Sequence, residues 1–243
     1  MKRTCRSLLL LPSLAASLIM LGGFSVPEVH PLHVQVDPVL LPSADIVIDA
    51  GHGGIDGGTS EGSLLEKDIN LAMGRKLYDH LTGLGYRTVL DRTGDYAPSE
   101  DNQWMPNPSR HLRDLGQRAG IANLLHPRLV LSLHVNTSPR TGKSGGIVLY
   151  SKANPESHQL SRLLQTSLNR VYGTNNVPVL GKTFYILKRI KSPTVIVELG
   201  FLSNAADRAR LTSPKGQDEL VQALGEAVRQ FWSLPADSGD ASS

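Results

Sequence analysis

Cysteine and aromatic residues are scarce in this sequence. Cys5 is the only cysteine in 243 residues, and phenylalanine, tryptophan and tyrosine together make up 5% of the chain. The chain after Cys5 therefore has no partner for an internal disulfide and no thiolate to serve as a metal ligand or nucleophile. Low-complexity tracts are also missing, which excludes collagen-like repeats and argues against intrinsic disorder or a long coiled coil.

Excess charge is small and confined to one end of the chain. The formal net charge is +3. Lys2, Arg3 and Arg6 supply this surplus, and basic and acidic residues balance from Ser25 onward. A balanced chain lacks the surplus of basic residues that neutralises phosphates, so we predict no nucleic-acid partner.

The three basic residues precede an apolar run, Leu8–Phe24, which Pro12 interrupts. A basic stub before such a run is typical of a secretory signal, and the flanking charges argue against a buried core helix. The run is shorter than the roughly 20 residues that span a bilayer. We predict that residues 1–24 form a signal peptide or an N-terminal anchor, so that the protein is exported and contacts the membrane only through this leader.

Three further segments follow the leader. Prolines recur through residues 25–44, which predicts an extended spacer. Residues 45–232 have the length of a single α/β domain. The small polar residues 233–243 predict a disordered tail.

Strands and helices are expected to alternate within residues 45–232. Short runs rich in apolar and β-branched residues predict strands at Ile46–Asp49, Arg87–Leu90, Leu129–Leu133, Gly146–Tyr150, Phe184–Leu187 and Thr194–Glu198. Amphipathic segments predict helices at Lys67–Leu84, Ser109–Leu125, Glu156–Tyr172 and Gln217–Trp232. This order predicts an α/β fold with a single, largely parallel or mixed sheet and helices on both faces.

Residues capable of chemistry lie at the ends of three predicted strands. His52 and His134 each follow a strand, and Glu198 ends a third. Glu66 precedes the first helix, on the connection that follows His52. Ligands of open α/β sheets bind at the carboxyl ends of the strands, so these four side chains are placed where they could converge.

Two histidines and two carboxylates are the side chains that a catalytic zinc hydrolase needs. Three of them bind Zn²⁺ and leave the fourth position for water, whose pKa the metal lowers toward ~7. The remaining carboxylate takes the proton of the water and delivers it to the leaving amine. A single histidine at a strand end is more often a packing residue, so packing remains the competing interpretation of each histidine taken alone.

Other sites have weaker support. The turn Gly51–Gly58 lacks the glycine spacing of a phosphate-binding loop, so its glycines are expected to allow close approach of the backbone to a ligand or metal. No serine lies in a nucleophile elbow, which disfavours a Ser-His-Asp hydrolase.

Asp49 is expected either to orient a ligand imidazole or to pack at the strand end. The remaining histidines are expected in the spacer or on the solvated surface: His30, His33, His80, His111, His126 and His158.

Four sequence blocks carry a family resemblance. They are IVIDAGHGGIDGG at 46–58, EKD at 66–68, SLHVN at 132–136 and VELGFLSN at 197–204. In this order the blocks resemble those of the zinc-dependent N-acetylmuramoyl-L-alanine amidases. The resemblance extends over most of residues 45–232 and makes that segment a zinc amidase catalytic domain.

This resemblance implies a fold, a metal site and a reaction. The fold is a twisted mixed sheet flanked by helices. His52, Glu66 and His134 bind Zn²⁺, and Glu198 is the catalytic carboxylate. The substrate is peptidoglycan, in which the family cleaves the amide between the lactyl group of N-acetylmuramic acid and L-alanine of the stem peptide.

The short exported form and the segment Phe184–Thr194 are similar to the germination-specific amidases, which act on spore-cortex peptidoglycan and prepare muramic δ-lactam. This similarity implies a role in spore cortex maturation, with the forespore intermembrane space as a location, and leaves open an activating protein partner. Two alternatives remain. One is a non-catalytic peptidoglycan-binding protein with a vestigial site, and the other is a zinc peptidase that cuts within the stem peptide.

Overall fold

A computed structural model describes residues 43–100 and 107–234 of the chain. The predicted leader, nearly all of the predicted spacer and most of the predicted tail lie outside the described residues. Within the described ranges, no helix is long and apolar enough to cross a membrane.

A six-stranded sheet lies at the centre of the domain, with strand order β4-β1-β5-β8-β6-β7. Its strands are β1 (Ile46–Ala50), β4 (Thr88–Leu90), β5 (Leu129–Asn136), β6 (Ile147–Tyr150), β7 (Val179–Leu180) and β8 (Thr194–Phe201). The four strands from β4 to β8 are parallel, β6 is antiparallel to β8, and β7 is parallel to β6. The sheet is therefore mixed and largely parallel, as predicted. A separate hairpin pairs β2 (Ser60–Glu61) with β3 (Leu64–Leu65).

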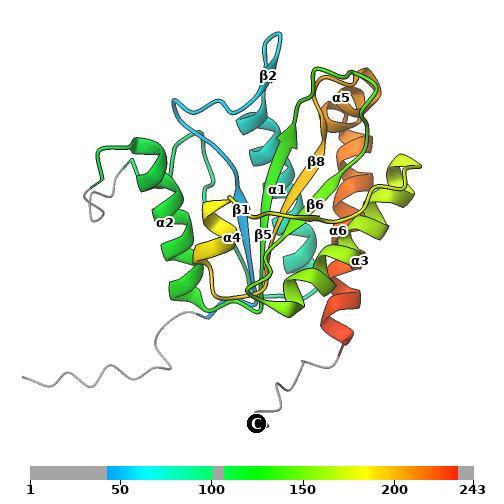
Figure 1. Cartoon of the computed structure of the whole chain (residues 1–243). Helices are drawn as coiled ribbons and strands as arrows, with labels where there is room; N and C mark the ends of the chain where they lie inside the picture. The colour runs from blue at the N-terminus through cyan, green and yellow to red at the C-terminus, as the bar shows by residue number, and fades with distance from the viewer. Residues whose placement is uncertain (1–42, 101–106, 235–243) are drawn as a thin grey trace, which may run out of the picture. The chain divides into compact units, whose positions relative to one another are not determined.

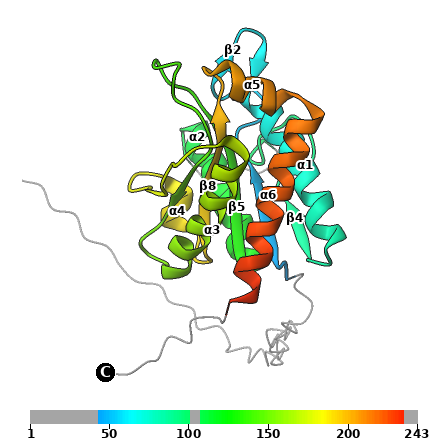
Figure 2. The ribbon, with the colours of Figure 1, turned by 90° about the vertical axis from the view of Figure 1, so that its right-hand side faces the viewer.

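Helices cover both faces of the sheet (Figures 1 and 2). They are α1 (Glu66–Gly83), α2 (Arg110–Leu125), α3 (Pro155–Tyr172), α4 (Tyr185–Arg189), α5 (Ala205–Thr212) and α6 (Pro214–Ser233). Alternate residues of a strand point to opposite faces. Ile46 and Ile48 of β1 are accordingly buried with side chains of α1, α3 and α6, whereas Val47 is buried with side chains of α2 and α4. The prediction of a single α/β domain with helices on both faces is confirmed.

One predicted strand is wrong. Phe184–Leu187 was expected to be a strand, but Tyr185–Arg189 forms the short helix α4. A short apolar run does not distinguish a strand from a buried helix by periodicity. Here the neighbours Ile186 and Leu187 are both buried, in different clusters. The edge strand that pairs with β6 is β7, which was not predicted.

The remaining differences are small elements that were not predicted and shifts at the ends of the domain. Helix α5 and the hairpin of β2 and β3 were not predicted. Helix α6 extends through Ser233, one residue beyond the predicted end of the domain. At the other end, Ala44 of the predicted spacer is buried against α2.

Candidate active site

The sheet brings three of the predicted site residues to one edge. Strands β1, β5 and β8 are adjacent and parallel, so their carboxyl ends meet. The register of β5 and β8 pairs His134 directly with Glu198. His52 lies two residues beyond the end of β1, and Glu66 begins α1.

His52, Glu66 and His134 form a compact cluster. Their nearest ligand atoms all lie within 4.8 Å of one another. Oε1 of Glu66 is 3.2 Å from Nε2 of His52 and 3.0 Å from Nδ1 of His134. The two imidazoles meet edge to face at 5.0 Å. The prediction that these three side chains converge is confirmed geometrically.

The Glu66 carboxylate is fixed from several directions. Its Oε2 accepts a hydrogen bond from the Thr59 amide at 2.8 Å, and its Oε1 accepts one from the Val135 amide at 3.0 Å. Burial by itself would raise the pKa of Glu66, but hydrogen bonds and charge from His134 and His52 outweigh burial and hold the pKa far below its usual range. Glu66 is therefore an anion at neutral pH.

Asp56 orients His52 and was missed by sequence reasoning. Its Oδ2 lies 3.1 Å from Nδ1 of His52, which leaves Nε2 directed at Glu66. Burial lowers the pKa of His52, but Glu66 and Asp56 together raise it to about 8. A second carboxylate on the outer nitrogen is typical of metal-ligating histidines. Asp56 lies four residues after His52, and the sequence carries no further signal for it.

The donor set suits a divalent cation. Two imidazoles and one carboxylate are typical ligands of catalytic zinc. Glu66 is only 5% exposed in its side chain, whereas His52 and His134 are 20% and 22% exposed. The carboxylate therefore lies beneath two imidazoles that face a pocket, and the chemistry of the three donors fits Zn²⁺.

The pocket above the cluster has a volume of about 640 Å³ and also contains Glu198. Among the described residues, the Glu198 carboxylate has no hydrogen-bond or ion-pair partner. Burial raises its pKa, more than the His134 charge lowers it. A carboxylate with a raised pKa can accept and return a proton near neutral pH.

The wall of this pocket is apolar and its rim is cationic. Leu112, Leu115, Phe184, Ile186 and Ile196 form the apolar lining. His111, Lys188 and Arg189 add polar and basic side chains from α2 and α4. His111 was expected on the solvated surface. It is exposed, but it lines the same pocket as Glu198. Only the folding of α2 and α4 onto one face of the sheet places these residues together.

Glycines in the turn after β1 let the backbone lie close to the side chains of the cluster. A Cβ on Gly51 would lie 2.4 Å from Cε1 of His134, and one on Gly58 would lie 2.5 Å from Oε2 of Glu66. The interpretation of these glycines as sites of close backbone approach is supported.

The structure does not place Asp49 at an imidazole: its Oδ2 accepts from the Ser132 hydroxyl at 2.5 Å. Ser132 is fully buried in this contact, which disfavours it as a nucleophile.

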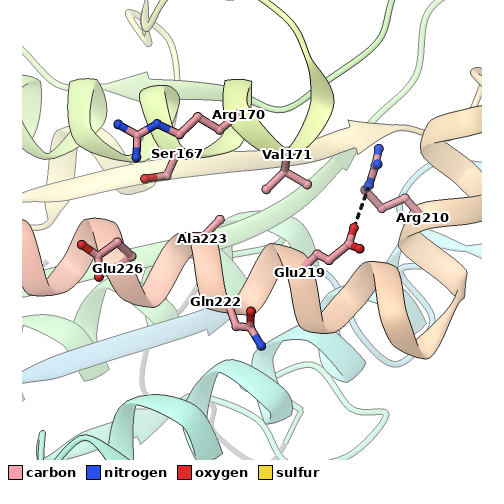
Figure 3. Close-up of a pocket in the computed structure, with 8 residues that line it drawn as sticks. All are labelled: Ser167, Arg170, Val171, Arg210, Glu219, Gln222, Ala223 and Glu226. Carbon is pink, nitrogen blue, oxygen red and sulfur yellow. Dashed lines mark ion pairs between the residues drawn. The ribbon is translucent and has the colours of Figure 1, made fainter.

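A second hollow lies away from the cluster, between α3, α5 and α6 (Figure 3). It is lined by side chains of both charges, including an Arg210–Glu219 ion pair at 3.6 Å. No histidine lines it in the described part of the chain, and its basic and acidic groups oppose one another. The pocket at the strand ends is therefore the candidate active site.

Comparison with known proteins identifies the family. Residues 46–230 match the family model described as N-acetylmuramoyl-L-alanine amidase. The chain is 29% identical to the germination-specific N-acetylmuramoyl-L-alanine amidase of Bacillus subtilis over 79% of this chain and 81% of that protein.

Two solved structures have the same fold. The CwlD amidase of Clostridioides difficile, solved in complex with the GerS lipoprotein, superposes with a TM-score of 0.73 and 30% identity over 79% of this chain and 100% of that chain. The amidase AmiC2 of Nostoc punctiforme gives a TM-score of 0.66 at 25% identity over 79% and 99%. With its match to the family model over most of its length, the chain belongs to the N-acetylmuramoyl-L-alanine amidase family of peptidoglycan hydrolases.

Proposed function

We propose that the protein is a zinc-dependent amidase that cleaves the bond between the lactyl group of N-acetylmuramic acid and L-alanine. The observation that carries this proposal is the cluster of His52, Glu66 and His134, which shares one pocket with the Glu198 carboxylate. That carboxylate has no ion-pair partner in residues 43–100 and 107–234. A pure binding protein would not need a partly buried carboxylate, unpaired among the described residues, beside three metal-capable side chains, because removing an unpaired charge from water costs free energy.

Each residue has a distinct part in the reaction. His52, Glu66 and His134 hold the metal, which when bound supplies Lewis acidity and lowers the pKa of water. Glu198 takes a proton from the attacking water and passes it to the departing amine of L-alanine. The raised pKa of Glu198 matches this exchange, because a strongly acidic carboxyl would return the proton poorly.

The pocket suits an acidic peptide attached to a sugar. Its apolar wall can receive the methyl groups of the lactyl and alanyl units. Neither Lys188 nor Arg189 forms an ion pair within the described residues. Both side chains are exposed, with the Arg189 guanidinium 5.4 Å from the centre of the Tyr185 ring. Their positive charges can bind the carboxylates of the stem peptide, which extend beyond the scissile amide.

The biological setting is proposed from the relatives. The germination-specific relative supports a role in spore-cortex peptidoglycan, and the CwlD complex with a lipoprotein supports an activating protein partner. Export through the predicted leader would place the enzyme outside the cytoplasmic membrane, with the forespore intermembrane space as the proposed location.

Mass spectrometry of digested muropeptides tests the activity. We expect stem peptides with a free L-alanine amine, and glycan with a free lactyl carboxylate, and we expect neither in the presence of a zinc chelator. Products cut within the stem peptide would instead show a zinc peptidase, and unchanged muropeptides would show a binding protein. Either result would overturn the proposal.

A further inference from the structure

We propose that Arg118 is a positioning residue that fixes the backbone of His52 and thereby the direction of its metal-binding nitrogen. This inference rests on the proposed function, because it concerns the metal that the cluster would hold. Arg118 lies on α2, on the side of the sheet opposite α1, and does not line the substrate pocket.

The Arg118 guanidinium donates directly to the loop that carries His52. Its Nη2 donates to the His52 carbonyl at 2.6 Å, and its Nη1 donates to the Ala50 carbonyl at 2.9 Å. The side chain is 2% exposed. Hydrogen bonds in such a buried, water-free environment are strong. Loss of Arg118 would remove the guanidinium donor of the His52 carbonyl, whereas the Ala50 carbonyl also accepts from Arg92.

His52 needs such support because its backbone is strained. It has a φ of +64°, a left-handed backbone conformation that a non-glycine residue keeps only where the surrounding structure holds it there. A second buried arginine acts on the same loop: Nε of Arg92 donates to the Ala50 carbonyl at 2.7 Å, and its Nη2 to the Gly51 carbonyl at 3.1 Å. Three successive carbonyls therefore accept from two guanidinium groups.

Three buried carboxylates fix the guanidinium itself. Asp49 and Asp91 accept from Nη1 at 2.6 and 2.8 Å, and Asp114 accepts from Nε at 2.7 Å. Burial and the neighbouring Asp49 charge raise the pKa of Asp91 well above its usual range, which reduces the negative charge around Arg118. The carboxylates occupy Nε and Nη1, and Nη2 is left for His52.

A buried ion pair does not by itself show that a protein gains stability. The role of Arg118 is inferred instead from the atoms that its N–H groups contact: Nη2 donates to the His52 carbonyl, while Nε and Nη1 donate to carboxylates. Lysine could keep the charge among the carboxylates, but it lacks the planar fork that reaches His52 and Asp114 together. The residues that hold a metal ligand in place typically contribute 10- to 100-fold in metal affinity.

The test compares Arg118→Lys with the full-length wild type. Zinc affinity is measured by chelator competition, and the visible absorption of the cobalt(II)-substituted protein reports the coordination. Leu164→Ala is the control, because Leu164 is buried in α3 and its truncation lowers stability without touching the His52 loop. We expect Arg118→Lys to bind zinc about 10- to 100-fold more weakly and to show an altered cobalt spectrum. Leu164→Ala should keep both properties.

A folded Arg118→Lys protein with wild-type zinc affinity and cobalt spectrum would overturn the inference. If Arg118→Lys does not fold, Asp114→Asn replaces it: a smaller loss of zinc affinity is expected, and unchanged affinity would overturn the inference. The wild type separates the two proposals. If it binds no zinc, the proposed function fails. If it binds zinc as tightly as the variant does, only the role of Arg118 fails.

Discussion

Oε1 of Glu66 lies 3.0 Å from Nδ1 of His134, although the two residues are 68 positions apart in the chain. The contact joins the first residue of α1 to β5, a strand in the middle of the sheet. Because the carboxylate is buried and ionised, its place is set by the fold and not by solvent.

Glu198→Gln should separate metal binding from catalysis. Glutamine keeps the size of the side chain but cannot accept the proton from water. We expect kcat to fall by about 10²- to 10⁴-fold, the usual contribution of general acid–base catalysis. Zinc content, measured by elemental analysis, should stay at the wild-type level. Substantial hydrolysis by the variant would remove Glu198 from the mechanism.

The stability of the metal-free protein should depend on the protonation of His52. The pKa of His52 is raised from 6.5 to about 8, so protonated His52 favours the folded state. This contribution, about 2 kcal/mol, is fully present below pH 6.5 and is lost as the pH rises through 8. Urea unfolding of chelator-treated protein at pH 6 and pH 9 measures it. The His52→Ala variant should lack this part of the pH dependence. An equal loss in that variant would contradict the assignment to His52.

Lys188→Gln combined with Arg189→Gln should weaken substrate binding more than catalysis. An ion pair of an exposed side chain contributes about 0.2–1 kcal/mol, so loss of both should raise KM about 2- to 30-fold while kcat changes little. Lys182→Gln is the matched control, since Lys182 is exposed and does not line the pocket. A stem peptide whose carboxylates are amidated should show a smaller difference between variant and wild type. Equal KM values for the double variant and the control would refute carboxylate binding at this rim.

Gly51→Ala and Gly57→Ala form a matched pair within one turn. The added methyl group on residue 51 would lie 2.4 Å from the His134 ring, whereas on residue 57 it would meet nothing closer than 3.6 Å. We expect Gly51→Ala to displace His134 and lose zinc, with activity falling in parallel. Gly57→Ala should retain both. Zinc stoichiometry and muropeptide hydrolysis of the two proteins provide the measurement, and full zinc binding by Gly51→Ala would contradict the packing described for His134.

The convergence of the four site residues could be predicted from the sequence because it follows from topology. Parallel strands end at the same edge of a sheet, so the apolar runs that lead to His134 and Glu198 predict that both lie there. In the structure β5 and β8 continue past them, to Asn136 and Phe201. The partners of these residues could not be predicted in this way. Asp56 lies in a turn with no periodicity, and Arg118 meets the His52 carbonyl only because α2 packs against β1. Sequence spacing carries no information about either contact.

The prediction that failed has a related cause. Tyr185–Arg189 is short, and its apolar residues suit a strand as well as a helix. Ile186 is buried against α2 and β1, and Leu187 against β6 and β8. Tertiary packing therefore decided the secondary structure. The consequence for function is direct, because the helical turn exposes Lys188 and Arg189 at the pocket, which a prediction of a strand ending at Leu187 did not foresee.

Titration of the metal-stripped protein with zinc tests most directly whether the cluster of His52, Glu66 and His134 supports amide cleavage. The readout is the release of stem peptide with a free L-alanine amine. We expect no release without zinc, a rise in rate up to one zinc per chain, and no further rise beyond that ratio. His134→Ala should stay inactive at the same zinc concentrations. Full activity of the stripped protein, or a rate that does not respond to zinc, would contradict a zinc-dependent amidase.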